Sequence, residues 1–327
     1  MSASAELRCG TCAAAIALED RFCEQCGAPA AAADSAQGGC VSCGAPAAAV
    51  GEDGYCTVCG VLRRPAAERA ELDLVVAAAV SDQGRVHQRN EDAFDLQLVA
   101  DRGVAAVVCD GVSSASAGDT AAQAAARAAG AVLAAAIGDP GRDPSDATVA
   151  AIGAAHDAVA QVPWTTRVDR AVPSCTLVSA LWRGSELVVG WIGDSRAYWL
   201  EGGRCRPLTV DDSWAEEQVA DGLLSREEAA RDRRFHSITH WVGADAPDRP
   251  PRVVALTPEA PGRLVLCTDG LWNYAPSAEE LGALIEALPA GAGPAAVARS
   301  LTETALARGG RDNITVAVVD IDPVREP

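Results

Sequence analysis

Several short apolar runs in the second part of the sequence each end in an acidic residue. Asp110 closes the run AVVCD, Asp194 closes VVGWIGD, and Asp269 closes LVLCTD. Runs of this length, rich in Val and Leu, predict buried strands, so the chain must assemble sheets whose strand ends carry charge. If those ends converge, their carboxylates form a cage of hard oxygens that suits Mg²⁺ or Mn²⁺ and suits zinc poorly.

Further acids stand at the start of predicted strands. Glu91 and Asp92 precede the run that begins near Phe94, and Asp312 precedes NITVAVVDI. Gly follows two of the strand-end acids and lets the backbone approach closely, so a carbonyl such as that of Gly111 can join carboxylates around an ion. An Asp-Gly pair alone is also a common hairpin signal. Acids at four strand boundaries, together with the Asn-Glu-Asp cluster, favour a metal site over isolated turns.

The order of the predicted elements indicates sheets that are covered by helices. Because strands come in runs and helices come in runs, the pattern predicts an α+β domain of two packed sheets flanked by helices over residues 73–323. The predicted strands are 74–80, 94–100, 103–109, a meander from 174 to 200, 251–256, 262–268 and 313–321. The predicted helices are 119–137, 145–162, 214–232, 278–288 and 294–307.

The first 60 residues hold eight of the twelve cysteines, arranged as four Cys-x-x-Cys pairs. The pairs form a repeat of two units, separated by the flexible spacer APAAAADSAQGG. Two such pairs close a tetrahedral Cys₄ site, whose metal stabilises a segment with too small a core of its own. We therefore predict two structural zinc ribbons in residues 1–60 and a linker at 61–72, with the other four cysteines as small core residues. If the pairs combine in sequence order, one ligand set is Cys9, Cys12, Cys23 and Cys26, and the other is Cys40, Cys43, Cys56 and Cys59. Interleaved pairing of the same cysteines is the alternative.

Composition argues against two classes of partner. The formal net charge is −18, and residues 1–72 carry five Arg against nine acids, whereas nucleic-acid phosphates require a basic face. No apolar run approaches the length of a membrane span, and the N-terminus MSASAELRCG lacks the pattern of a signal peptide. We expect a cytoplasmic protein with no nucleic-acid or membrane partner, in which paired cysteines are ligands and not disulfides.

The motifs NED, DG, GDSR, TDG and GGRDNITV occur in that order between about residue 74 and residue 321. This ordered set resembles the metal-dependent Ser/Thr protein phosphatases of the protein phosphatase 2C type. The resemblance implies a four-layer αββα sandwich, two antiparallel sheets flanked by helices, preceded here by the two small zinc ribbons. The run LTVDDSWAEEQVADGLLSREEA is similar to the family's mobile flap. Near it, we expect His236 and His240 to be surface residues, with contact to substrate as the alternative.

The resemblance also implies a reaction and its metal ligands. A water activated by two Mg²⁺ or Mn²⁺ ions would hydrolyse phosphoserine or phosphothreonine in a phosphoprotein. The partners would be that phosphoprotein, a cognate Ser/Thr kinase or its targets, and a protein recruited through the zinc ribbons as a docking or regulatory module. The implied ligands are Asp110, Gly111, Asp269, Asp312, Glu91, Asp92 and Asp194. Asp110 would bridge both ions, and Asp194 would hold a weaker third ion.

The sequence departs from the family pattern at two places. His87 occupies the position where the family has an Arg that binds the substrate phosphate, and Arg89 can supply the missing charge. No His follows Asp110 to act as general acid, and Ser113 and Ser114 replace a Gly pair. The general acid is therefore water, His87 or absent. The alternative to an active phosphatase is a weakly active or inactive scaffold that binds partners through the zinc ribbons.

Overall fold

The chain divides into two compact units, Met1–Ala67 and Glu68–Pro327. In the first unit, β1 (Leu7–Arg8) pairs antiparallel with β2 (Ala15–Ile16). The eight paired cysteines lie outside the described residues, so the zinc ribbons stay a prediction. The computed structural model describes residues 7–8, 15–16, 69–99, 102–165 and 171–323.

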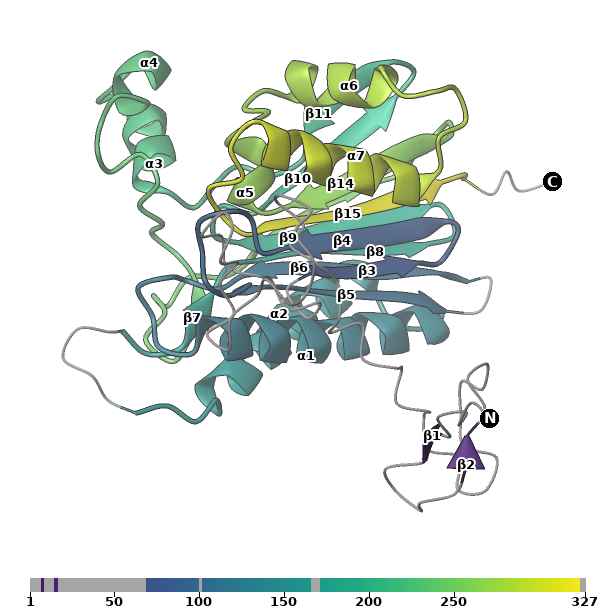
Figure 1. Cartoon of the computed structure of the whole chain (residues 1–327), viewed down its shortest axis with the longest axis horizontal. Helices are drawn as coiled ribbons and strands as arrows, with labels where there is room; N and C mark the ends of the chain where they lie inside the picture. The colour runs from purple at the N-terminus through teal and green to yellow at the C-terminus, as the bar shows by residue number, and fades with distance from the viewer. Residues whose placement is uncertain (1–6, 9–14, 17–68, 100–101, 166–170, 324–327) are drawn as a thin grey trace, which may run out of the picture. The chain divides into compact units, whose positions relative to one another are not determined.

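Two antiparallel sheets form the centre of the second unit (Figure 1). In spatial order, the six-stranded sheet consists of β11 (Arg204–Pro207), β10 (Arg196–Glu201), β14 (Gly262–Cys267), β15 (Ile314–Ile321), β4 (Ala77–Asp82) and β3 (Arg69–Asp73). The five-stranded sheet consists of β13 (Arg252–Leu256), β9 (Glu186–Ile192), β8 (Leu177–Arg183), β6 (Gly103–Asp110) and β5 (Asp92–Val99). The expectation of an α+β domain built on antiparallel sheets is confirmed.

Helices cover the outer face of each sheet (Figure 1). Two long helices pack on each other and on the five-stranded sheet, namely α1 (Gly118–Gly138) and α2 (Pro144–Ala160). Three helices lie against the six-stranded sheet, namely α5 (Asp269–Trp272), α6 (Ala278–Glu286) and α7 (Pro294–Ala307). A short pair, β7 (Ser174–Cys175) and β12 (Val242–Gly243), lies beside α1 and α2, and α3 (Trp214–Ala220) packs with α4 (Arg226–Ala229).

The central strand β6 shows why its sequence is a continuous apolar run. Alternate side chains of a strand point to opposite faces of the sheet. Both faces of β6 are covered, so both sets must be apolar. Val104, Ala106 and Val108 belong to the cluster that also contains Leu264 and Trp199 of the six-stranded sheet. The intervening residues Ala105, Val107 and Cys109 pack in the cluster formed with α1 and α2.

Helix α1 corrects one expectation. Its 21 residues are long and apolar enough to span a membrane by length and composition, although no such run was expected. Its alanine face is buried against α2 and the five-stranded sheet, as in the core helix of a soluble domain. Small side chains permit this close approach: a Cβ on Gly130 would lie 1.8 Å from Oδ2 of Asp95 on β5.

Two other expectations differ from the structure. Residues 69–72, predicted to belong to the linker, form most of β3, a largely exposed edge strand whose polar residues resemble a linker. The single helix predicted at 214–232 is two short helices. The first ends at Ala220, and Gly222 just after it has a φ of 69°, a left-handed conformation that stops the helix from continuing. Ser225 caps the second helix with a capping box. Cys109, Cys175 and Cys267 are buried as predicted, and Cys205 is half-buried.

The packing between the sheets predicts a large difference between two leucine substitutions. Leu264 is fully buried between the sheets, whereas Leu223 is 67% exposed. Leu264→Ala should lower the free energy of unfolding by about 2–5 kcal/mol, because it leaves a cavity that the core does not refill. Leu223→Ala, the matched control, should change it by less than about 0.5 kcal/mol. Urea unfolding followed by Trp fluorescence measures both values, and equal effects would contradict the observed packing.

Candidate metal centre

Strand pairing brings the predicted acidic residues to one end of the two sheets. In the five-stranded sheet, Asp92 at the start of β5 lies opposite Asp110 at the end of β6. In the six-stranded sheet, Cys267 at the end of β14 pairs with the first residue of β10 on one side and with Val316 of β15 on the other. The loops at this end therefore carry Asp194 before β10, Asp269 after β14 and Asp312 before β15.

The pKa of Asp110 reflects the other carboxylates at this end of the sheets. Burial raises this pKa well above its usual range, and four neighbouring carboxylates raise it further. In order of size, the four are Asp92, Asp269, Asp194 and Asp312. Like charges in a poorly solvated site oppose ionisation of one another, so the cluster favours either bound protons or bound cations.

Two members of the cluster carry unsatisfied oxygens. Burial raises the pKa of Asp92 to about 8 and that of Asp269 to about 7, and Asp312 adds to both shifts. Thr268 Oγ1 donates to Asp92 Oδ2 at 2.9 Å and so links the two sheets. The other oxygen of Asp92 and Oδ1 of Asp269 are buried with no hydrogen-bond partner in the structure. A buried, unpaired carboxylate oxygen is costly, and a cation or a proton relieves that cost.

A second group of side chains fixes the loop that carries Asp194. Trp272 Nε1 donates to the Asp194 carbonyl at 2.9 Å, and the Arg196 guanidinium lies 3.8 Å above the Trp272 ring. Arg196 in turn makes a bidentate pair with Asp211 at 2.9 and 2.8 Å. Burial and the carboxylates of Asp269 and Asp211 raise the pKa of Asp194 well above its usual range. Sequence reasoning missed these supporting residues, although the GDSR motif contains Arg196.

Asp212 joins the same loop to the segment that was compared with a flap. Its Oδ2 accepts from Gly193 N at 3.1 Å, and its Oδ1 lies 2.8 Å from Arg252 Nη2. His240 Nδ1 lies 3.7 Å from Asp212 Oδ2. The expectation that His240 is a surface residue is wrong, because it is only 2% exposed.

Asn313 ties the loop before β5 to the loop before β15. Its side-chain amide donates to the carbonyls of Gln83 and Arg89 at 2.7 and 2.9 Å, and its Oδ1 accepts from Glu91 N at 2.7 Å. Sequence reasoning assigned no role to Asn313. Its position between Asp312 and a buried strand was the available signal.

Two glycines allow the backbone to pass close to the cluster. A Cβ on Gly111 would lie 2.6 Å from Gly118 and 2.7 Å from the Glu91 carbonyl oxygen. A Cβ on Gly270 would lie 1.8 Å from the Asn313 carbonyl oxygen. No side chain fits at either place, so the two Asp-Gly pairs serve close approach here and not hairpin turns.

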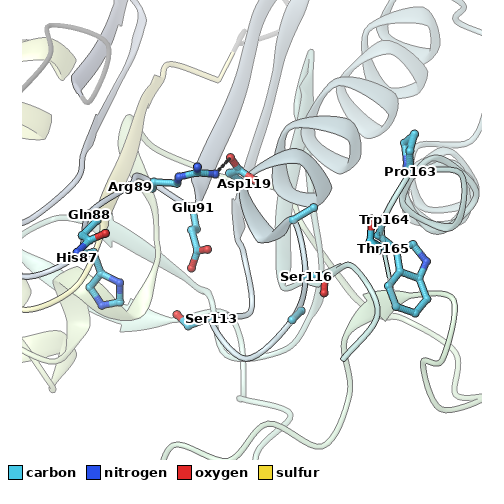
Figure 2. A pocket seen from close by; sticks show the side chains of 12 residues that line it. His87, Gln88, Arg89, Glu91, Ser113, Ser116, Asp119, Pro163, Trp164 and Thr165 are labelled. Carbon is cyan, nitrogen blue, oxygen red and sulfur yellow. Dashed lines mark ion pairs between the residues drawn. The ribbon is translucent and has the colours of Figure 1, made fainter. Parts of the chain in front are cut away.

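His87, Arg89 and Glu91 line a polar pocket of about 790 Å³ beside the cluster (Figure 2). His87 Nε2 lies 3.2 Å from Asp312 Oδ1, whereas Arg89 turns to Asp119, with 3.7 Å between Nη1 and Oδ2. The structure therefore brings His87 to the carboxylate cluster and pairs Arg89 with a different acid.

The donor set fits hard divalent cations. Every candidate side chain is a carboxylate, and oxygen ligands are those that Mg²⁺ and Mn²⁺ prefer. Within the described part of the chain, no group of three His, Cys, Asp or Glu side chains is arranged to hold an ion as it stands. A bound cation would replace the mutual repulsion of these carboxylates with attraction.

Sequence comparison identifies the family. The family model described as Protein phosphatase 2C matches residues 83–304, which include the whole five-stranded sheet, three strands of the six-stranded sheet and most of the covering helices. The chain belongs to the protein phosphatase 2C family. The resemblance inferred from the ordered motifs is confirmed at this level.

Individual relatives agree with the family assignment. The Serine/threonine protein phosphatase PstP of Mycobacterium tuberculosis (strain ATCC 25618 / H37Rv) is 33% identical over 262 residues, which cover 77% of this chain and 46% of the relative. The chain thus spans about half the length of that curated relative. The crystal structure of M. tuberculosis PstP/Ppp superposes with a TM-score of 0.61 at 31% identity and covers 75% of this chain and 98% of that one. A crystal structure of the PstP catalytic domain in complex with 2 manganese ions superposes with a TM-score of 0.56 at 31% identity. The match covers 75% of this chain and 96% of that one.

The raised pKa values predict how stability depends on pH in the absence of added cations. Folded Asp92 and Asp269 hold protons up to about pH 8 and about pH 7, whereas an unfolded Asp loses its proton near pH ~3.9. The folded state binds more protons in between, so the free energy of unfolding should fall as pH rises from about 4 to about 8. In the Asp92→Asn variant the side chain at this position cannot ionise. Its free energy of unfolding should therefore fall less steeply than that of the wild type, by up to about 1.4 kcal/mol per pH unit.

Urea unfolding followed by Trp fluorescence measures this dependence, because all seven Trp residues lie after residue 68 and report on the second unit alone. Asp157→Asn, an exposed position on α2, is the control for the charge change. A wild-type stability that is flat or rises over this pH range would contradict the assigned shifts.

Proposed function

We propose that this protein is a metal-dependent Ser/Thr protein phosphatase that hydrolyses phosphoserine and phosphothreonine in proteins. The observation that carries the proposal is the group of five carboxylates from five strand ends, two of which carry a buried oxygen with no hydrogen-bond partner. Membership of the protein phosphatase 2C family and relatives named as serine/threonine phosphatases support it. The three separate hydrophobic clusters support the finer proposal of a four-layer αββα arrangement.

The cluster would hold two Mg²⁺ or Mn²⁺ ions, with Asp110 between them and the Gly111 carbonyl beside it. Asp269 and Asp312 would complete one ion, and Glu91 and Asp92 the other. When bound, these ions supply Lewis-acid stabilisation of the phosphoryl group and an activated water. Asp194 would hold a weaker third ion.

The side chains around the cluster have separate tasks in this proposal. His87 contacts the substrate phosphate, and Asp312, whose Oδ1 lies 3.2 Å from His87 Nε2, orients the ring. Arg89, which is largely exposed, adds positive charge at the rim of the pocket in Figure 2. Arg196 and Trp272 hold the Asp194 loop in place, so the carboxylates keep their spacing during turnover.

Metal-dependent turnover tests the proposal. With Mn²⁺, the wild-type protein should hydrolyse a phosphothreonine peptide, and EDTA should abolish the reaction. Asp269→Asn should lower kcat/KM at least about 100-fold, because even outer-shell partners of metal ligands are worth about 10- to 100-fold. Asp157→Asn makes the same charge change at an exposed position on α2 and should retain wild-type turnover. Phosphate release measures each rate.

A weakly active or inactive scaffold is the competing function. The replacement of the family Arg by His87 is the observation that favours it. Folded protein that binds Mn²⁺ and releases no phosphate from any of several peptides would contradict the phosphatase proposal. His87→Arg would then restore turnover if the missing guanidinium is the sole defect.

For the first unit, we propose two structural zinc ribbons that act as a docking or regulatory module and bind a protein partner. A cognate Ser/Thr kinase or its targets would be partners of the phosphatase itself. The regular spacing of the four Cys-x-x-Cys pairs supports the zinc ribbons. Zinc bound to thiolates would stabilise each ribbon, because the ordered metal site replaces an extensive core.

Metal analysis tests the ribbons. The purified protein should contain about two equivalents of zinc, since each Cys₄ set binds one ion. Cys9→Ser should remove about one equivalent, whereas Cys205→Ser on β11 should remove none. Retention of both equivalents in Cys9→Ser would contradict the assignment of that cysteine as a ligand. Turnover of the phosphothreonine peptide by the same variants shows whether the ribbons influence the second unit.

A further inference from the structure

A second, smaller cavity adjoins the carboxylate cluster. It has a volume of about 380 Å³ and is lined by His236, Tyr274, Arg308 and Arg311, together with Asp312 of the cluster. Three segments that are distant in sequence meet here, namely the loop after α4, the residues that follow α5, and the loop between α7 and β15. We call it the arginine pocket.

Tyr274 and two glycines hold the loop that carries both arginines. Arg308, directly after α7, donates through Nη1 to the Tyr274 carbonyl, and Arg311 N donates to the Tyr274 hydroxyl at 2.9 Å. Gly309 and Gly310 have φ values of 144° and 53°, which let the chain turn sharply between the arginines. The loop is therefore built to present both guanidinium groups at one place.

The two guanidinium groups differ from most others in the domain. Arg69, Arg196 and Arg263 each make a hydrogen-bonded pair with a carboxylate. Among the residues that the structure describes, neither Arg308 nor Arg311 lies within ion-pair distance of a carboxylate. Both are exposed, in a chain of net charge −18. Two adjacent arginines without acidic partners attract an anion, and guanidinium geometry suits carboxylate and phosphate.

His236 also lines the arginine pocket. Its ring stacks on Trp272 with 5.9 Å between the ring centroids, and it contacts Phe235 edge to face. Trp272 is the residue that binds the Asp194 carbonyl. The arginine pocket is thus attached to the framework of the metal centre and shares Asp312 with it.

The pocket that His87 lines has a different charge. There, Glu91 and Asp119 face the cavity, and the guanidinium of Arg89 is already paired with Asp119 (Figure 2). The two carboxylates offset the charge of Arg89 there, so an anionic group beside the reacting phosphate would be attracted more strongly on the side of Arg308 and Arg311.

We propose that the arginine pocket is a substrate subsite that binds an anionic side chain close to the phosphorylated residue of the peptide. The anion is a carboxylate or a second phosphate, which share the chemistry that guanidinium groups recognise. This inference rests on the proposed phosphatase function, because the pocket adjoins the centre at which the first phosphate would be hydrolysed. Arg308 and Arg311 are then specificity-determining residues.

Three phosphothreonine peptides test the subsite. One has Glu on both sides of the phosphothreonine, one has Gln at the same positions, and one carries a second phosphothreonine. With the full chain and Mn²⁺, kcat/KM for the Glu peptide should exceed that for the Gln peptide by about tenfold or more, because charge-assisted hydrogen bonds are the strong ones. A greater preference for the doubly phosphorylated peptide would identify phosphate as the bound group, and a greater preference for Glu would identify carboxylate.

Single charge-removing variants assign the preference to the pocket. Arg308→Gln and Arg311→Gln should each lower the Glu-to-Gln ratio several-fold, and the double variant should bring it to about one. Arg204→Gln is the matched control, since it removes the same charge at the far end of the β10–β11 hairpin and should keep the wild-type ratio. Having two single variants keeps the test decisive if one of them disturbs the loop, which unfolding curves would reveal.

The outcomes separate failure of the subsite from failure of the phosphatase proposal. Equal kcat/KM for the Glu and Gln peptides, with good turnover of both, would overturn the subsite alone. An unchanged ratio in the double variant would also overturn it. If no peptide is turned over, the phosphatase proposal fails, and peptide Kd values from fluorescence anisotropy then decide the subsite. Tighter binding of the Glu peptide that depends on both arginines would support the subsite, and equal Kd values for the Glu and Gln peptides would overturn it.

Discussion

Repulsion among buried carboxylates is the constraint that the rest of the domain has to satisfy. Asp110 has four acidic neighbours, and each of them makes ionisation of its carboxyl less favourable. An isolated group of this kind would separate into solvent, because like charges with little water between them repel strongly. The domain holds the group at fixed spacing with two hydrogen-bonded sheets, and a bound cation would convert this electrostatic cost into binding energy.

The features around the cluster can be understood as means of holding it. Strand registers place Asp92 opposite Asp110, and Thr268 connects the two sheets through Asp92. Asn313 joins two loops through three hydrogen bonds, and Gly111 permits a contact that any side chain would block. These positions are rigid because each is tied to a sheet end or a buried backbone group, which is what pre-organisation of a polar site requires.

Much of the fold followed from local patterns. Strand β6 was predictable because a strand covered on both faces must be apolar throughout. Residues 69–72 were assigned to a linker because an exposed edge strand contains polar residues that carry no periodic signal. The break at Gly222 was missed because a single glycine inside a polar helical pattern does not reveal its φ. For the site, the acids were predicted by their strand-end positions, whereas Asn313 and the partner of Arg89 depended on contacts between distant segments.

The sequence by itself determined the kind of chemistry, because strand ends rich in carboxylate and glycine specify oxygen ligands and close backbone approach. It also determined the family, through motifs whose order is independent of geometry. Only the tertiary structure decided which charges are paired. It directed Arg89 to Asp119 and left Arg308 and Arg311 facing a cavity beside Asp312. The physical reason is that the pairing of a charge depends on distance in space, which residues far apart in sequence acquire only when the sheets pack.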